Sequence, residues 1–173
     1  MNHIDKEKIY IFDANVFINL HRINKHSIPL PNEVWEKIGE LMDKGKIISH
    51  TTVYKEIVSE SKNPDNVSKW VMAHKDSFKS HTQAQLKIIS EVVEKYPKLI
   101  DYGNERDQAD PWLVALAVEM SNQDIAHDYA VVTQENQTST VKLPAVCREF
   151  GIRAIDLASF FTENGITFGI SFS

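Results

Sequence analysis

Short apolar runs alternate along this chain with stretches whose apolar residues recur at helical spacing. The runs predict strands at 9–12, 46–50, 129–133 and 152–155. The amphipathic stretches predict helices that begin near Val16 and then cover 32–42, 51–58, 66–78, 82–96, 110–120, 143–150 and 156–164. Because strands that alternate with helices form parallel sheets covered on both faces, we expect an α/β fold.

Three stretches refine this picture. The helix at 110–120 is apolar nearly all round, which is typical of a helix buried between layers. The two helices expected between 63 and 97 form a helical insert, and the second has an apolar face of Leu86, Ile89, Val92 and Val93. The tail at 166–172 alternates apolar and small residues and predicts an edge strand. We expect residues 1–173 to form one domain that carries this insert.

The composition is that of a soluble globular protein. With 173 residues, 42% of them hydrophobic and 25% charged, the chain can bury about 70% of its unfolded surface in one core. No apolar run approaches the roughly 20 residues of a membrane-spanning helix. Residues 1–8 are polar and lack a signal-peptide pattern, so we do not expect export. The single cysteine, Cys147, cannot form an internal disulfide, and this favours the cytoplasm.

The charge and the motifs exclude several classes of function. A net charge of −5 argues against a protein that coats nucleic acid through a broad basic surface, although it does not exclude a nuclease. The seven histidines show no spacing typical of zinc ligands, and no glycine-rich phosphate loop follows a strand. A Gly-x-Ser-x-Gly nucleophile elbow is absent as well.

Four acidic residues provide the candidate chemistry: Asp13, Glu56, Asp110 and Glu135. Three of them stand where an apolar run stops and a turn or helix begins, and open α/β sheets keep their ligand sites at the carboxyl ends of strands. Carboxylate oxygens are the ligands that Mg²⁺ and Mn²⁺ prefer. The pattern therefore predicts a divalent-metal site suited to phosphodiester hydrolysis by a metal-activated water.

Neighbouring polar residues extend this site. Asn15 lies two positions after Asp13, and Thr133 lies two positions before Glu135, so each pair can point the same way on an extended chain. We predict that Asn15 and Thr133 support the acidic residues, and that Asp107 replaces or assists one of them.

Each acidic residue also has a structural interpretation. Asp13 can cap the helix that follows it, and Asp110, followed by proline, resembles a helix N-cap. Glu56 is not the acidic member of a capping box, since Val53 stands three residues before it, but its side chain can simply be solvated. Two clustered carboxylates repel, so without a cation at least one pKa should be raised.

The same residues resemble the PIN domain family, whose members include the ribonuclease toxins of bacterial toxin–antitoxin pairs. The closing Lys142-Leu143-Pro144 and Phe150-Gly151-Ile152 are similar to a PIN-like branch of formerly unassigned function. The segments that carry the wider resemblance are 11–18, 52–57, 107–117 and 131–135.

The resemblance implies a three-layer α/β/α fold and an RNA endonuclease that depends on Mg²⁺ or Mn²⁺. It also implies an antitoxin partner that occludes the cleft, and frequent homodimers. Asp13, Glu56, Asp110 and Glu135 become the catalytic metal ligands. Two features depart from the family: Glu135 stands where many members have aspartate, and the insert between Glu56 and Asp110 is longer than in compact toxins.

Two alternatives remain open on the sequence. One is a catalytically inactive PIN-like module that binds RNA or protein, because a fold does not guarantee activity. The other is a metal-dependent DNA or flap nuclease, which substrate preference would distinguish.

Overall fold

The computed structural model describes residues 6–26, 31–58, 65–100 and 108–167. Its centre is a five-stranded parallel sheet in the order β3-β2-β1-β4-β5. The strands are β1 (Glu7–Phe12), β2 (Ile47–His50), β3 (Phe78–Lys79), β4 (His127–Val132) and β5 (Arg153–Ile155).

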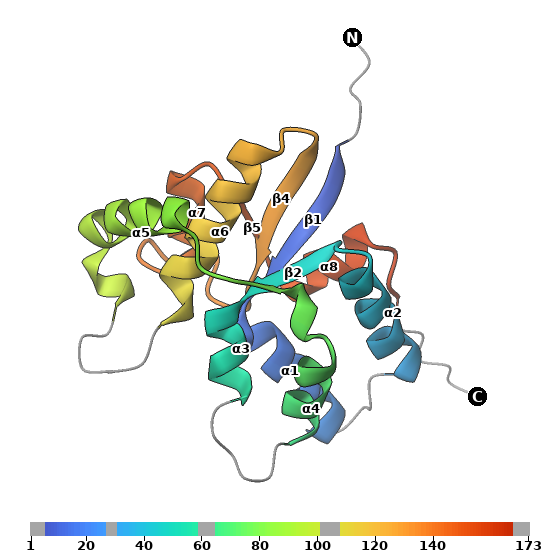
Figure 1. The fold of residues 1–173 in the computed structure, drawn as a ribbon. Coiled ribbons are helices and arrows are strands. Elements are labelled where there is room, and N and C mark those ends of the chain that lie inside the picture. Colours follow the sequence, from blue (N-terminus) through green and yellow to red (C-terminus); the bar gives the residue numbers. More distant parts are fainter. Residues whose placement is uncertain (1–5, 27–30, 59–64, 101–107, 168–173) are drawn as a thin grey trace.

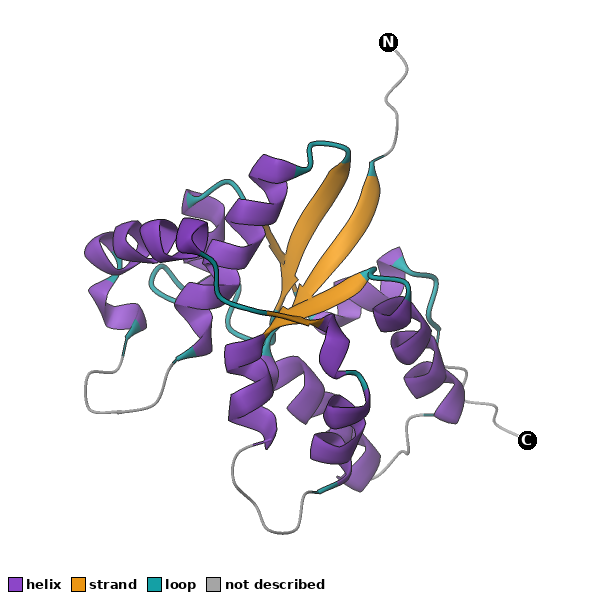
Figure 2. Cartoon of the chain, viewed as in Figure 1, coloured by secondary structure: helices purple, strands orange, loops and turns teal. Residues whose placement is uncertain are grey.

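Helices cover both faces of this sheet. Figure 1 shows α5, α6 and α7 on one side and α2 and α8 on the other, while α1, α3 and α4 gather beyond the carboxyl ends of β1 and β2; Figure 2 separates the helices from the strands by colour. The predicted α/β/α fold with a parallel sheet is confirmed. The α-helices are α1 (Ala14–His26), α2 (Asn32–Asp43), α3 (Thr51–Val58), α4 (Asn66–Ala73), α5 (Gln83–Lys95), α6 (Ala109–Gln123), α7 (Leu143–Glu149) and α8 (Leu157–Glu163), and the short 3₁₀ helices are η1 (Lys75–Ser77) and η2 (Pro97–Leu99).

The register of the two central strands decides where the polar residues at their ends lie. β1 pairs with β4 along its whole length, from Glu7 opposite His127 to Phe12 opposite Val132. The next residue on each strand is therefore Asp13 on one and Thr133 on the other. The Asp13 N–H continues the ladder by donating to the Val132 carbonyl at 3.1 Å. Two residues 120 positions apart thus become neighbours at one edge of the sheet.

The core packs around these central strands. The residues from Leu113 to Ala117 on α6 are almost completely buried, which confirms the prediction of a helix enclosed between layers. On the opposite face of the sheet, the Phe160 ring of α8 meets the rings of Tyr10 and Phe12 edge-on, with centroids 4.9 Å away in both cases. Such aromatic pairs add to the burial of apolar area in holding α8 on the sheet.

The predicted helix at 66–78 is wrong beyond residue 73. The α4 helix stops at Ala73, η1 follows, and Phe78 and Lys79 form the edge strand β3 beside β2. The buried Phe78 ring packs against Phe17 and Tyr54, with centroids 5.9 and 5.4 Å away. Tertiary packing of this one ring and backbone pairing with Ser49 favour an extended chain over another helical turn.

The predicted apolar face of α5 is wrong in one main respect. Leu86 is 45% exposed, whereas Gln85 is buried at 1% exposure. Gln85 can be buried because both the oxygen and the nitrogen of its side-chain amide have hydrogen-bond partners there. Its oxygen lies 3.2 Å from His50 Nε2, and its nitrogen donates to Glu119 Oε2 at 2.6 Å. A buried polar network replaces the apolar contact that the sequence pattern indicates.

His50 is the inner end of this network. Its Nδ1 accepts a hydrogen bond from the Thr52 N–H at 3.1 Å and lies 2.8 Å from the Thr52 hydroxyl. Because Nδ1 is an acceptor, the proton of the neutral ring is on Nε2, which donates to Gln85. The ring also stacks on Trp112 at a centroid distance of 5.0 Å and an angle of 12°. Burial, followed by the nearby His81 and Lys55, lowers the pKa of His50 to about 4.

Other sequence predictions have mixed outcomes. Cys147 is buried and free of disulfides, as expected of a small helix residue. Residues 168–173 of the expected edge strand lie outside the described residues, and Ile166 and Thr167 are not in a strand. No helix in the described ranges is both long and apolar enough to cross a membrane. The single domain over 1–173, with an insert at 63–97, stays a prediction.

Candidate functional site

Asp13 is the most buried of the four acidic residues, at 4% exposure. It follows β1 directly, and its Oδ2 atom accepts hydrogen bonds from Asn15 Nδ2 at 2.6 Å and from the Thr133 hydroxyl at 2.8 Å. The pKa of Asp13 is raised to about 6, mainly by burial and to a smaller extent by the charges of Glu135 and Glu56, while hydrogen bonds from Thr133 and the Ala14 backbone oppose the rise. A buried carboxyl group with two polar supports is therefore fixed at the edge of the sheet.

Thr133 and Asn15 link the ends of the two central strands. The fully buried Thr133 hydroxyl donates to Asp13 and accepts from Asn15 Nδ2 at 3.1 Å and from the Glu135 N–H at 3.2 Å. The oxygen of Asn15 accepts from the Gln134 N–H at 2.9 Å. The sequence placed both residues beside the acidic site, and the structure brings them into direct contact with Asp13.

Asp110 lies in the first turn of α6 and is not its N-cap. The helix begins at Ala109, its N-cap is Gln108, and the Gln108 side chain makes no capping hydrogen bond. The capping interpretation of Asp110 is therefore wrong by two positions. Although part of the residue remains exposed, burial raises the pKa of its carboxyl group well above the ordinary range.

The other three acidic residues act on Asp110 as well. The charges of Asp13, Glu135 and Glu56 each raise its pKa, in that order, after burial. Glu56, on the exposed side of α3, has its own pKa raised by partial burial. All four predicted carboxyl groups thus share one region of negative potential, although they come from four separate segments of the chain.

The Glu135 side chain caps the start of α7, a structural role that the sequence did not indicate. Its Oε2 atom accepts a hydrogen bond from the Leu143 N–H at 2.8 Å, where α7 begins. Its Oε1 atom lies 3.8 Å from Lys142 Nζ. The first N–H groups of a helix have no partner within the helix, so Glu135 stabilises the start of α7. The longer glutamate side chain reaches this helix while its backbone stays beside Thr133.

A family profile described as "Domain of unknown function (DUF4411)" matches residues 10–168. The chain belongs to this DUF4411 family. No curated protein matches it. Among solved structures, the chain is similar to one described as the crystal structure of VapBC2 from Rickettsia felis bound to a DNA fragment from their promoter. That match has a TM-score of 0.49 and 16% sequence identity, and it covers 86% of this chain and 98% of that chain.

Lys142, which the sequence marks only through the family resemblance of its segment, lies beside Glu135. In this DUF4411 protein its charge lowers the pKa of Asp110, and its ammonium group pairs with Glu135. It therefore lies at the rim of the acidic site, where it offers a positive charge to an incoming anion. Its position directly before Leu143-Pro144, at the N-cap of α7, was the available signal.

Asp107 and Cys147 remain to be considered. Asp107, predicted to assist the acidic residues, lies outside the described residues. Burial raises the pKa of the Cys147 thiol, and the charges of Asp110 and Asp13 raise it further. Since the thiolate is the reactive form, this cysteine is not equipped to act as a nucleophile.

The donor chemistry of the DUF4411 site fits a hard divalent cation. Burial, together with the charges of neighbouring carboxylates, disfavours the ionised forms of Asp13 and Asp110, and a bound cation would relieve the repulsion between those charges. Among the residues that the structure describes, no group of three or more His, Cys, Asp or Glu is placed so that it could hold a metal ion. The fit therefore rests on the type of donor and on the shared potential rather than on preformed coordination.

Proposed function

We propose that this DUF4411 protein is a metal-dependent endoribonuclease, the toxin of a toxin–antitoxin pair. The observation that carries the proposal is that Asp13, which Thr133 and Asn15 hold at the end of β1, lies in a group of acidic side chains. After burial, the charges of Asp13, Glu135 and Glu56 raise the pKa of Asp110. Shifted pKa values of this kind, caused by burial together with specific charged neighbours, are concentrated at functional sites. The resemblance of the same four segments to PIN domains supports the reaction class.

Asp13, Glu56, Asp110 and Glu135 would hold Mg²⁺ or Mn²⁺. A bound ion of this kind supplies an activated water molecule and stabilises the charge that develops on a phosphodiester. The residues of the chain hold its ligands in place. Thr133 and Asn15 fix one oxygen of Asp13 through two hydrogen bonds, so the carboxylate needs little reorientation on binding.

Lys142 would help to receive the substrate. Its ammonium group lies at the same rim as Glu135, with the two groups 3.8 Å apart. A phosphate that approaches the acidic carboxyl groups meets this positive charge first, which offsets part of the repulsion at short range. We expect single-stranded or loop RNA as the substrate, because its splayed backbone can enter a narrow site.

The remaining proposals follow from the family resemblance. We propose an antitoxin protein that covers the acidic site, a homodimer as the assembled state, and the cytoplasm as the location. The free, buried Cys147 is consistent with a reducing compartment.

A second candidate is a PIN-like module that binds RNA or protein without cleaving it. The side chain of Glu135 favours this alternative, because its Oε2 atom is already engaged by the Leu143 N–H. A carboxylate oxygen that caps a helix has one fewer lone pair for a cation. The finding that no three candidate ligands in the described ranges stand ready for a metal ion points the same way.

The test is cleavage of a panel of tRNA, other structured RNA, single-stranded RNA and single-stranded DNA by the purified protein. Each substrate is incubated with Mn²⁺, with Mg²⁺ or with EDTA. RNA cleavage that requires a metal ion supports the endoribonuclease. Cleavage of DNA alone would replace it with a DNA nuclease, and binding without cleavage of any substrate would favour the inactive module.

A further inference from the structure

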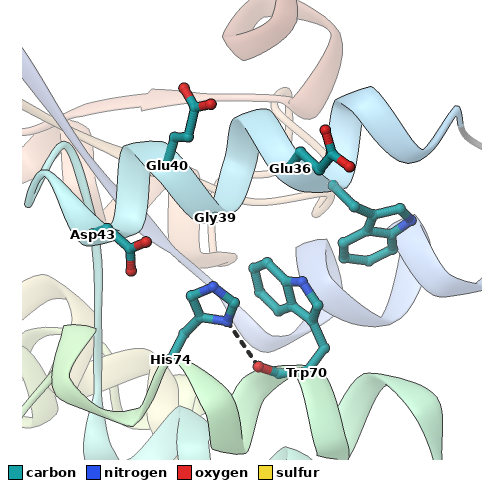
Figure 3. A pocket seen from close by; sticks show the side chains of 7 residues that line it. Glu36, Gly39, Glu40, Asp43, Trp70 and His74 are labelled. Carbon is teal, nitrogen blue, oxygen red and sulfur yellow. Dashed lines mark hydrogen bonds between the residues drawn. The ribbon is translucent and has the colours of Figure 1, made fainter.

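A cleft of about 460 Å³ opens between α2 and α4, on a part of the molecule that the proposed acidic site does not use. Figure 3 shows its lining, with α2 along one side and the rings of α4 along the other. The residues that line it are Trp35, Glu36, Gly39, Glu40, Asp43, Trp70 and His74. Aromatic rings and carboxylates are thus the two kinds of group that it offers to a ligand.

The aromatic wall is tightly ordered. The Trp35 and Trp70 rings have centroids 5.2 Å apart at an angle of 60°, and the Trp70 and His74 rings are 4.1 Å apart at 31°. His74 Nδ1 donates to the Trp70 carbonyl oxygen at 2.9 Å, because a carbonyl can only accept. That bond fixes the orientation of the His74 ring within the cleft.

Gly39 lets these rings approach α2. A Cβ atom at this position would lie 3.1 Å from His74 Nε2 and 3.9 Å from the Trp70 ring. The His74 ring would therefore have to move by a few tenths of an ångström, whereas the contact with the Trp70 ring would be an ordinary one. Glycine in a helix interior costs about 1 kcal/mol relative to alanine, and here it makes room for the aromatic wall.

Three carboxylates stand at the rim of the cleft, and Figure 3 shows that of Glu40 pointing away from the Trp70 and His74 rings. Glu40 lies 4.0 Å from Lys37 and 3.9 Å from Lys44, so its charge is partly compensated. Glu36 and Asp43 stand at opposite ends of the lining, and within the described part of the chain neither has a cationic partner at ion-pair distance. Asp43 points toward the His74 end of the cleft (Figure 3).

This combination selects an organic cation. The face of an indole ring carries negative potential and attracts a guanidinium or ammonium group, and a carboxylate at the edge pairs with the same group. Arginine fits best, because its planar guanidinium stacks on an aromatic face while its N–H groups reach a carboxylate. A phosphate would be repelled by the rim, and a hard metal ion would find too few oxygen ligands among the rings.

A second hollow indicates that this cation belongs to a polypeptide. It has a volume of about 210 Å³, and Trp35 and Trp70 line both hollows. Asn32 and Asn66 also line it, and an asparagine amide offers a donor and an acceptor that match a peptide group. A chain can therefore place its main chain over the asparagines and its side chain in the acidic cleft.

We propose that the cleft between α2 and α4 binds the guanidinium group of an arginine in a partner polypeptide. The guanidinium stacks on Trp35 and Trp70 and pairs with Asp43 or Glu36. This inference does not rest on the proposed nuclease activity.

The experiment follows the indole N–H signals of Trp35, Trp70 and Trp112 by NMR while an acetylated glycine–arginine–glycine amide is added. The matched probe contains citrulline, which has the shape of arginine without its charge. We expect shifts at Trp35 and Trp70 but not at Trp112, and roughly tenfold weaker binding of the citrulline peptide. Equal binding of the two peptides, shifts confined to Trp112, or no shift at millimolar peptide would overturn the proposal.

Methylguanidinium alone distinguishes a free cation from a peptide. We expect it to shift the same two signals at several-fold higher concentration, and affinity equal to that of the arginine peptide would overturn the peptide as the source. Asp43→Asn and Gly39→Ala should each weaken the arginine peptide, while the exposed Glu91→Gln on α5 should not. If Gly39→Ala does not fold, Asp43→Asn and Glu36→Gln decide the question, and unchanged affinity in both overturns the role of the rim.

Discussion

Thr133 donates its hydroxyl hydrogen to Asp13 Oδ2 across 2.8 Å, although 120 positions separate the two residues. The full-length pairing of β1 with β4 creates this contact, because it brings the residues that follow Phe12 and Val132 together. The same hydroxyl accepts from Asn15 and from the Glu135 N–H. One buried oxygen thus joins two of the segments that form the candidate site, 11–18 and 131–135.

Thr133→Val should damage the site without changing its shape. Valine fills about the same volume but leaves the Glu135 N–H without its acceptor, while Asn15 Nδ2 keeps only its bond to Asp13. An unsatisfied buried donor costs about 1–3 kcal/mol of unfolding free energy. We also expect RNA cleavage to fall, because Asp13 loses a support. Urea denaturation measures the first effect. Thr133→Ser keeps the hydroxyl and should retain most of the activity, so equal losses in both variants would contradict this account.

Asp13→Asn should stabilise the metal-free protein at neutral pH. Burial raises the pKa of Asp13 from 3.8 to about 6, so the folded state holds a proton that the unfolded state has released between these values. Stability contributed by this group is therefore present at low pH and is lost as pH rises through 6. We expect a gain of about 1–3 kcal/mol for the variant at pH 7.5, and no gain near pH 3.5.

A control with the opposite sign is available at Asp156. This residue caps α8, and hydrogen bonds from Ser159 lower the pKa of its carboxyl group. Asp156→Asn should therefore lose stability at pH 7.5 under the same conditions. A loss of stability in Asp13→Asn as well would show that the charge of Asp13 is not unfavourable in the metal-free fold.

His50 should make the fold sensitive to mild acid. Its pKa falls from 6.5 to about 4 on folding, so only the unfolded state gains a proton as pH drops from 6.5 towards 4. The groups that face His50 are Thr52, Gln85, His81, Trp112 and Lys55, and Glu119 lies beyond Gln85. We expect a loss of up to about 3 kcal/mol across this window.

A comparison of the wild type with a His50 variant separates the effect of His50 on stability from that of the acidic residues. Unfolding by urea is measured at pH 7.5, 6 and 5 for the wild type and for His50→Gln, which cannot take up a proton. The difference in unfolding free energy between the two proteins should shrink as pH falls. A difference that stays constant with pH would mean that His50 does not titrate as the structure implies.

Divalent cations should stabilise the folded state through the acidic residues. A ligand that binds only the folded state adds about 2.7 kcal/mol at one hundred times its dissociation constant. Thermal unfolding with Mn²⁺ or Mg²⁺ should therefore show a higher midpoint that EDTA reverses. Glu91→Gln should keep this response and Asp13→Asn should lose most of it; an equal response in both would place the metal elsewhere.

The fold was largely predictable because the local sequence pattern of most helices and strands matches the element that forms. The apolar run before Asp13, the residues at helical spacing in α2, and the wholly apolar α6 each carry a periodicity that packing does not override. β3 was not predictable, since two residues show no alternation. Its extended backbone depends on where Phe78 packs, and that is a tertiary fact.

The meeting of Asp13 with Thr133 was predictable from the sequence, but the contacts of Glu135 and Lys142 were not. The positions of Asp13 and Thr133 follow from strand ends, which the sequence marks clearly. The capping of α7 by Glu135 and the place of Lys142 depend on the path of the chain between 136 and 142. The sequence left two interpretations of Asp110, as a helix N-cap or as a metal ligand. The structure excludes the N-cap, because α6 already begins at Ala109.

The most direct test of the central claim compares RNA cleavage by the wild type, Asp110→Asn and Glu91→Gln in Mn²⁺, with EDTA as the blank. Multiple turnovers are followed on one substrate, and urea denaturation confirms that all three proteins are folded. We expect cleavage by the wild type and by Glu91→Gln, and at least a hundredfold loss, on the order of 3 kcal/mol in transition-state free energy, in Asp110→Asn. Undiminished cleavage by a folded Asp110→Asn would contradict the assignment of the acidic residues as the active site.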